Sequence, residues 1–141
     1  GLCYDVHSST SYLRDTGTFA IHAGVDPTNA LETVREIVSV LARARLPIEL
    51  EELERAKQQV RSRIQLQLED SRAISDWYGS RLALDLPLRE PEETIASFEQ
   101  VTIENLQQVA QRLIKDEHLQ LAVIGPITDT DALEGALKLD P

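Results

Sequence analysis

Apolar and polar residues alternate along the first 24 positions, a pattern typical of β-strands. Two alternating stretches, residues 2–12 and 17–24, flank the turn sequence Asp15-Thr16-Gly17. Alternation on both sides of a glycine-containing turn predicts an antiparallel hairpin. If residue 12 pairs with residue 17, His7 lies opposite His22. Strict alternation also predicts two faces for the first strand, one with Leu2, Tyr4, Val6 and Ser8 and the other with Cys3, Asp5 and His7.

Helical periodicity replaces this alternation after the hairpin. Asp26-Pro27 predicts a helix start, with apolar residues recurring at helical spacing until Pro47. A longer helical pattern begins near Glu49, loosens at residues 69–71 and then resumes. Thr102 is expected to cap a later helix. The predicted helices begin near residues 28, 49, 91 and 103, and a last acidic helix covers about residues 130–138.

The run LQLAVIG, residues 119–125, is apolar on both faces and predicts a third strand inside a sheet. The expected order is therefore β-β-α-α-α-α-β-α. This order favours an α+β fold, in which helices cover an antiparallel or mixed sheet. With no long linker or internal repeat, residues 1–141 are expected to form a single domain.

Composition narrows the classes of partner. The 24 acidic and 14 basic residues give a net charge of -10, which disfavours binding to nucleic acid. No apolar run approaches the roughly 20 residues that span a bilayer, so no membrane partner is expected. Cys3 is the single cysteine, which excludes an intrachain disulfide and favours a reducing cytoplasm, with the periplasm as the alternative.

The histidines are the first candidates for chemistry. His7 and His22 could share a metal across the hairpin, but a zinc site needs at least three protein ligands, and His118 is far away in the sequence. Two partly exposed strand histidines are the favoured interpretation. No HExxH, HxxEH or CxxC motif occurs. The cluster Ser8–Ser11 lies in a strand and lacks the glycine-flanked turn of a serine nucleophile.

Other polar and aromatic clusters favour structural roles. The long helical pattern carries several carboxylates, namely Glu51, Glu52, Glu54, Glu69 and Asp70. Arginine and lysine three or four positions away predict that this face pairs with itself and is solvated. Trp77 and Tyr78 are expected to pack. The residues alone therefore predict no complete active site and no metal site.

Six segments in order resemble the pitrilysin/insulinase family of zinc metallopeptidases, the inverzincins. They are GLCYDVHSS, DTGTFAIHAGVDPTNA, EELERAKQQV, LEDSR, VTIENLQQVAQRLI and LQLAVIGP. Family members have two homologous domains that close around a peptide; the first carries the HxxEH zinc site and the second is usually catalytically empty. The resemblance implies that this chain is the second half of that second domain. A start at Gly1 by processing, cloning or truncation fits this expectation.

The resemblance implies a role for Tyr4. In the family, a tyrosine at this place and an arginine seven residues earlier reach the zinc domain and contact the substrate near the scissile carbonyl. The arginine would precede Gly1. In the zinc domain, the helix equivalent to EELERAKQQVRSRI supplies a glutamate ligand, whereas Val60–Ile64 here contains no carboxylate. The chain alone is therefore expected to be inactive, with no cofactor of its own and with zinc in its partner domain.

The partners implied are the zinc-bearing homologous domain, in the same polypeptide or a separate subunit, and a peptide substrate. Two alternatives remain open. The chain could be a structural subunit, because the same fold occurs in respiratory complexes without peptidase activity. It could also be an interaction module that adds its first strand to a partner sheet.

Overall fold

The computed structural model describes residues 1–139, which form two compact units. The first unit contains residues 1–46 and the described residues from 107 onward, and the second contains Pro47–Leu106. The expectation of one partial domain over residues 1–141 stays a prediction.

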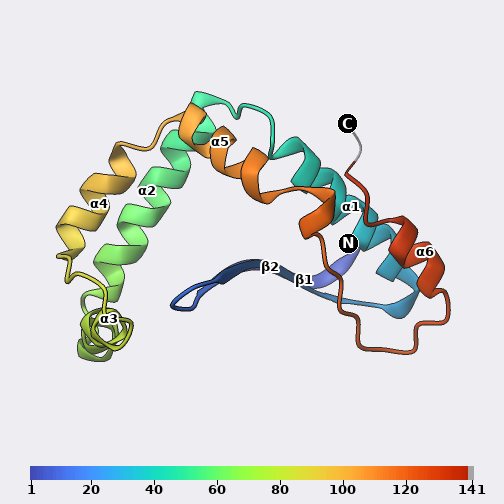
Figure 1. Cartoon of the computed structure of the whole chain (residues 1–141), viewed down its shortest axis with the longest axis horizontal. Coiled ribbons are helices and arrows are strands. Elements are labelled where there is room, and N and C mark those ends of the chain that lie inside the picture. Colours follow the sequence, from blue (N-terminus) through green and yellow to red (C-terminus); the bar gives the residue numbers. More distant parts are fainter. Residues whose placement is uncertain (140–141) are drawn as a thin grey trace. The chain divides into compact units, whose positions relative to one another are not determined.

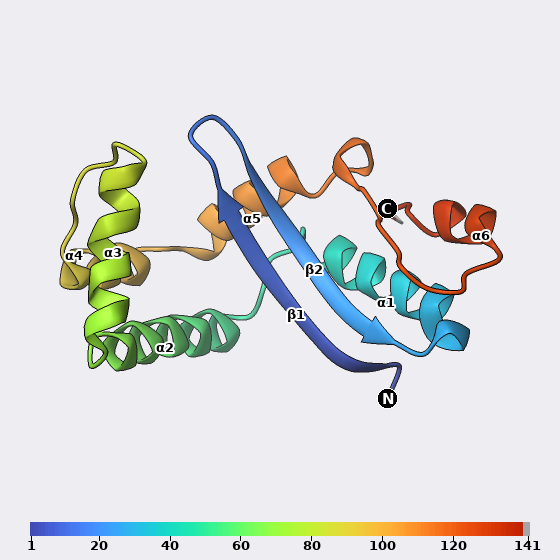
Figure 2. The ribbon, with the colours of Figure 1, turned by 90° about the horizontal axis from the view of Figure 1, so that it is seen from below.

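The first unit opens with an antiparallel hairpin of β1, Cys3–Tyr12, and β2, Gly17–Val25 (Figure 2). Tyr12 pairs with Gly17 and His7 with His22, so the predicted register is confirmed. The Leu13 amide donates to the Thr16 carbonyl at 2.8 Å and closes the turn. A Cβ on Gly17 would lie 2.7 Å from the Ser11 carbonyl oxygen, so the turn requires glycine there.

The register shifts by one residue near the start of β1. Cys3 pairs with Val25 and Asp5 with Gly24, which leaves Tyr4 as the extra residue of a β-bulge. Directly opposed residues share a face of the sheet. Cys3 therefore lies on the face of Val25, and the prediction that it shares a face with Asp5 is wrong because the bulge interrupts the alternation.

One helix follows the hairpin directly. Asp26 accepts a hydrogen bond from the Thr28 amide at 2.9 Å and begins the short 3₁₀ turn η1, Pro27–Asn29. The helix α1, Ala30–Arg43, continues from it and contacts the later helix α6 (Figure 1). The Thr33 hydroxyl, on the buried side of α1, donates to the Leu2 carbonyl at 3.5 Å. This contact joins α1 to the start of β1.

The second unit is helical. It contains α2, Leu50–Gln67, α3, Ser71–Ala83, and α4, Pro91–Glu99. The Asp70 carboxylate accepts from the Arg72 amide and caps α3, so the loosened pattern at residues 69–71 is a boundary between two helices. The order predicted from the sequence contained one helix fewer between the hairpin and residue 119.

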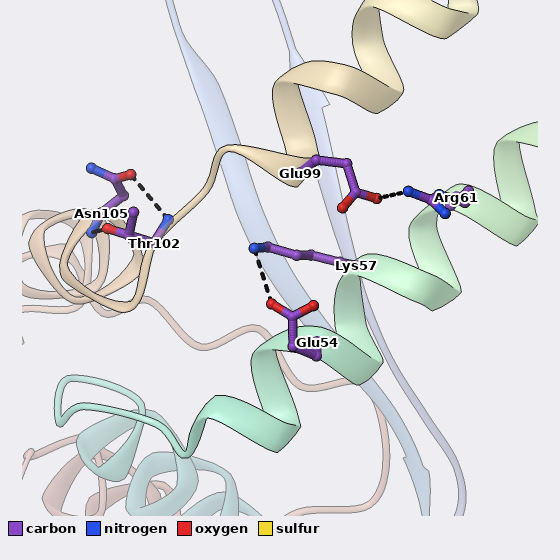
Figure 3. Close-up of polar contacts among 6 residues, drawn as sticks. All are labelled: Glu54, Lys57, Arg61, Glu99, Thr102 and Asn105. Atoms are coloured by element: carbon purple, nitrogen blue, oxygen red, sulfur yellow. Dashed lines mark hydrogen bonds and ion pairs between the residues drawn. The ribbon is translucent and has the colours of Figure 1, made fainter.

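Helices α2 and α4 pack together, with Leu53 and Ile64 of α2 and Pro91 of α4 buried. After α4, the helix α5, Ile103–Leu113, begins at Thr102 as expected. The Thr102 hydroxyl accepts from the Asn105 amide at 3.2 Å, and the Asn105 side chain accepts from the Thr102 amide at 3.1 Å (Figure 3). Each side chain thus satisfies a backbone donor at the helix start.

The prediction of a third strand at residues 119–125 is wrong. The sheet formed by the described residues has two strands, β1 and β2. The 3₁₀ turn η2, Asp116–His118, leads into this segment, and Leu119 has an extended backbone. Extended residues form a strand only when a neighbouring chain pairs with their backbone groups, and none of the described residues does so here. The side chains of Leu121, Val123 and Ile124 are consequently exposed.

The last helix, α6, spans Thr130–Gly135 and is shorter than predicted. It is capped by Asp129, which accepts from the Ala132 amide at 2.9 Å. The α+β class is confirmed, with an antiparallel pair followed by helices. The sequence predicted helices over the sheet, but Val6, Tyr12 and Phe19 of the hairpin are exposed, so the hairpin is not fully covered. Among residues 1–139, no helix combines the length and apolar character needed to cross a membrane.

Candidate functional site: a tyrosine at a strand bulge

Tyr4, the site residue expected from the sequence, is the inserted residue of the β1 bulge, and 81% of it is exposed. Within residues 1–139, its hydroxyl has no protein hydrogen-bond partner. Bulges often lie beside functional sites, where they redirect a side chain. A phenol here can donate a hydrogen bond to an external acceptor without breaking an internal one.

A polar row begins next to Tyr4 on the hairpin. Asp5 accepts a hydrogen bond from His7 Nδ1 at 3.0 Å, and both side chains are largely exposed. The His7 ring stacks on that of His22, with centroids 4.9 Å apart and planes at 19°. The predicted pairing of the two histidines is thus confirmed. Their rings lie against each other, and His7 also bonds Asp5.

Ser9 extends this row toward the turn. Its hydroxyl lies 3.2 Å from His22 Nε2, a contact that sequence reasoning missed. Register could have found it, because Ser9 pairs with Ala20 and is therefore the diagonal neighbour of His22. Ser11 and Thr18 form a similar hydroxyl pair at 3.0 Å. His22 could act as a base toward Ser9, but a catalytic base is oriented by a third group, and no hydrogen bond among residues 1–139 holds the other nitrogen of the His22 ring. Both side chains also lie on an exposed strand surface.

The donor set of the described residues does not fit a zinc ion. No three His, Cys, Asp or Glu side chains in residues 1–139 are grouped so that they could hold a metal. His118 instead uses Nδ1 to donate to the Leu113 carbonyl at 2.9 Å, at the end of α5.

Among residues 1–139, one carboxylate of α2 has an ion-pair partner. Glu54 pairs with Lys57 at 3.2 Å, as the spacing predicted (Figure 3). Arg61 lies in the stretch where the zinc domain of the family supplies a glutamate, and its guanidinium donates to Glu99 of α4 at 2.6 Å (Figure 3). This part of α2 therefore carries a cation that joins two helices.

Trp77 and Tyr78 form hydrogen bonds with the segment between α3 and α4, in agreement with the structural role expected for them. The Trp77 indole donates to the Arg89 carbonyl at 2.9 Å, and the Arg81 guanidinium lies 5.6 Å from the indole centroid. The Tyr78 hydroxyl donates to the Glu90 carboxylate at 2.8 Å. This hydrogen bond, with the nearby negative charge, raises the pKa of the Tyr78 phenol.

Comparison with known proteins supports the similarity to zinc metallopeptidases that the sequence indicates. Residues 1–60 match the family described as Peptidase M16 inactive domain. The chain is 29% identical over 132 residues to the mitochondrial-processing peptidase subunit alpha of Rattus norvegicus, covering 92% of this chain and 25% of that protein. It is 32% identical over 127 residues to an uncharacterized zinc protease of Mycobacterium tuberculosis, covering 89% of this chain and 29% of that protein.

A third relative is an uncharacterized zinc protease of Rickettsia bellii, 29% identical over 126 residues, which cover 89% of this chain and 30% of that protein. The chain thus spans between a quarter and a third of the length of these curated relatives. The match of residues 1–60, which contain Tyr4 and the whole hairpin, is to the domain described as inactive. Residues 1–60 thus match the inactive domain of the M16 peptidases, and about nine-tenths of the chain is similar to a peptidase subunit and to zinc proteases.

Proposed function

We propose that the chain is the non-catalytic, substrate-enclosing part of a zinc-dependent metalloendopeptidase, and that Tyr4 acts in the active site of a partner domain. The partner is the homologous domain that carries the zinc, in the same polypeptide or in a separate subunit. The substrate is a peptide. The likeness to a peptidase subunit and to zinc proteases supports this class of function.

The exposed bulge at Tyr4 is the observation that carries the proposal. A phenol with no internal hydrogen bond among residues 1–139 is ready to donate to the scissile carbonyl oxygen. Negative charge grows on that oxygen in the transition state, so a donor aimed at it stabilises the transition state more than the substrate. Tyr4 would therefore position and polarise the carbonyl, and cleavage would require the partner domain.

Zinc belongs to the partner in this proposal because the chain's own ligands do not fit it. The described residues hold no group of three metal-binding side chains. The chain alone is accordingly proposed to be inactive. A cytoplasmic location, expected from the single cysteine, stays a prediction.

A structural or protein-interaction subunit of the same fold is the second candidate. The exposed hairpin supports it, because strand β1 and the apolar side chains Val6 and Phe19 are accessible to a partner. In that case Tyr4 would be an interface residue without an effect on chemistry.

Reconstitution distinguishes the two candidates. The gene and its neighbours are searched for an HxxEH-bearing polypeptide of the family, which is purified alone and together with this protein. Cleavage of a quenched fluorescent peptide library is expected from the combination, and from neither component alone. Equal cleavage with and without this protein, or the lack of any HxxEH polypeptide of the family in the genome, would contradict the proposal.

A further inference from the structure

The first unit contains a groove of about 980 Å³ between α1, α5 and the C-terminal segment, remote in sequence from Tyr4. Its walls include Arg35, Arg43 and Arg45 from α1 and the turn after it, together with Gln111 and Lys138. Ala42, Leu46 and Ala136 add apolar surface to the lining. The groove therefore combines cationic and apolar side chains.

The charge of this groove is opposite to that of the chain. Four cationic residues line it against two carboxylates, Glu32 and Glu36, whereas the whole chain has a net charge of -10. Only Arg43 of these cations has an ion pair among residues 1–139, with Glu36 at 3.8 Å. The local excess of positive charge is therefore available to an anion from outside.

Arg45 gives an independent indication of a missing partner. Its Nε is buried and has no hydrogen-bond acceptor within the described part of the chain, although the residue as a whole is half-buried and lines the groove. A buried donor without an acceptor costs free energy that a carboxylate oxygen would recover. Gln111 holds the backbone beside it, because its side chain donates to the Arg45 carbonyl at 3.4 Å.

We propose that this groove binds an acidic peptide segment, with carboxylates at Arg35, Arg45 and Lys138 and an apolar side chain against Leu46. A peptide fits better than a free phosphate because the lining includes apolar side chains beside the cations, and one of them, Leu46, is exposed. The groove is distinct from Tyr4, so its occupant need not be the peptide that is cleaved. The inference does not depend on peptidase activity.

Fluorescence anisotropy with labelled hexaglutamate tests the proposal on the full-length protein. Removing two cations with Arg35→Ala and Arg45→Ala together is expected to weaken binding roughly tenfold, because charge pairs that water still reaches contribute up to about 1 kcal/mol each. The matched control is Arg14→Ala with Arg72→Ala, which changes the net charge equally at exposed positions outside the groove. The control is expected to change affinity less than about twofold, since neither arginine lines the groove and solvent-exposed charges outside it are screened by salt.

Folding and ligand class are checked in parallel. Circular dichroism and the urea midpoint show whether the double variant folds, and Arg35→Gln alone, at an exposed site, gives a milder test if it does not. Tripolyphosphate replaces hexaglutamate in a second titration. No binding of hexaglutamate, equal loss in the control variant, or binding of tripolyphosphate alone would each overturn the proposal.

Discussion

The β1–β2 hairpin and the α2–α4 helix pair are held by different interactions, backbone hydrogen bonds in the hairpin and side-chain contacts in the helix pair. The hairpin is held by the backbone ladder and the turn at Gly17, while many of its side chains are exposed. The helix pair buries Leu53 and Ile64 and adds an ion pair between Arg61 and Glu99. The candidate site lies on the first region, where side chains remain accessible to a partner.

This difference distinguishes residues that are available to bind a partner from residues that stabilise the fold. A side chain such as Tyr4, with its hydroxyl exposed and unbonded among the described residues, contributes little to folding, so its replacement is expected to change interactions alone. A buried side chain such as Leu53 contributes through packing, so its replacement is expected to change stability. Substitutions in the two regions should therefore have different consequences.

Truncation of the most buried leucine is expected to have the largest effect. Leu53 is 4% exposed, and Leu53→Ala should lower the free energy of unfolding by about 2–5 kcal/mol because it leaves a cavity. Leu50→Ala, on the same helix at a residue 62% exposed, is the control and should cost much less. Urea unfolding followed by circular dichroism measures both. Equal losses would show that α2 is not held by its buried side.

The hairpin turn should be the next most sensitive position. Gly17→Ala places a Cβ about 2.7 Å from the Ser11 carbonyl oxygen, which forces the backbone to move. Overpacking of this kind costs about 1–3 kcal/mol. Hydrogen exchange of the β1 and β2 amides should accelerate. Gly24→Ala, where a Cβ meets no atom within 4 Å, is the control, and similar acceleration in both variants would contradict a steric cause.

The ion pair between α2 and α4 should have a smaller effect. Arg61 and Glu99 are 42% and 37% exposed in their side chains, so water and salt screen their attraction. A double-mutant cycle with Arg61→Ala and Glu99→Ala is expected to give a coupling of roughly 0.2–1 kcal/mol. Added salt should reduce it. A coupling that does not respond to salt would mean that the pair acts through packing.

The smallest expected effect on stability concerns the Asp26 carboxylate, which lies between β2 and α1. Hydrogen bonds from the Thr28 hydroxyl and amide lower the pKa of Asp26. This contribution to stability is present above the unfolded-state pKa of Asp26 and is lost as the pH falls through its lower folded-state pKa. Thr28→Val removes the hydroxyl and should raise the pKa of Asp26 toward its ordinary value. Carboxyl NMR titration measures it, and an unchanged pKa would contradict the assigned cause.

Local patterns were enough to predict much of this fold. The turn at Gly17 fixed the pairing of His7 with His22, and Asp26 and Thr102 marked helix starts correctly. The role of Tyr4 rests on the family resemblance and stays a prediction. Its bulge was not predicted, because Cys3 and Tyr4 can each occupy either face of a hairpin, so the shift in register does not show in the order of residue types.

The prediction of a third strand failed for a different reason. The apolar run at residues 119–125 has a strand-like composition, but a strand also needs a partner for its backbone, which the described residues do not supply. The Arg61–Glu99 contact likewise depends on how two helices pack, which is a property of the folded chain. The Ser9–His22 contact differs, because it follows from the hairpin register that the turn predicts.

The role of Tyr4 is tested most directly by kcat in the enzyme reconstituted with its zinc-bearing partner. Tyr4→Phe removes one hydroxyl and leaves the ring, and the account predicts a fall in kcat of about tenfold or more, with assembly and zinc content unchanged. Tyr12→Phe is the control, because Tyr12 is 73% exposed on the same strand and distant from the bulge. A loss confined to KM would indicate uniform binding of the substrate. Unchanged kcat and KM for Tyr4→Phe in the assembled enzyme would contradict the account.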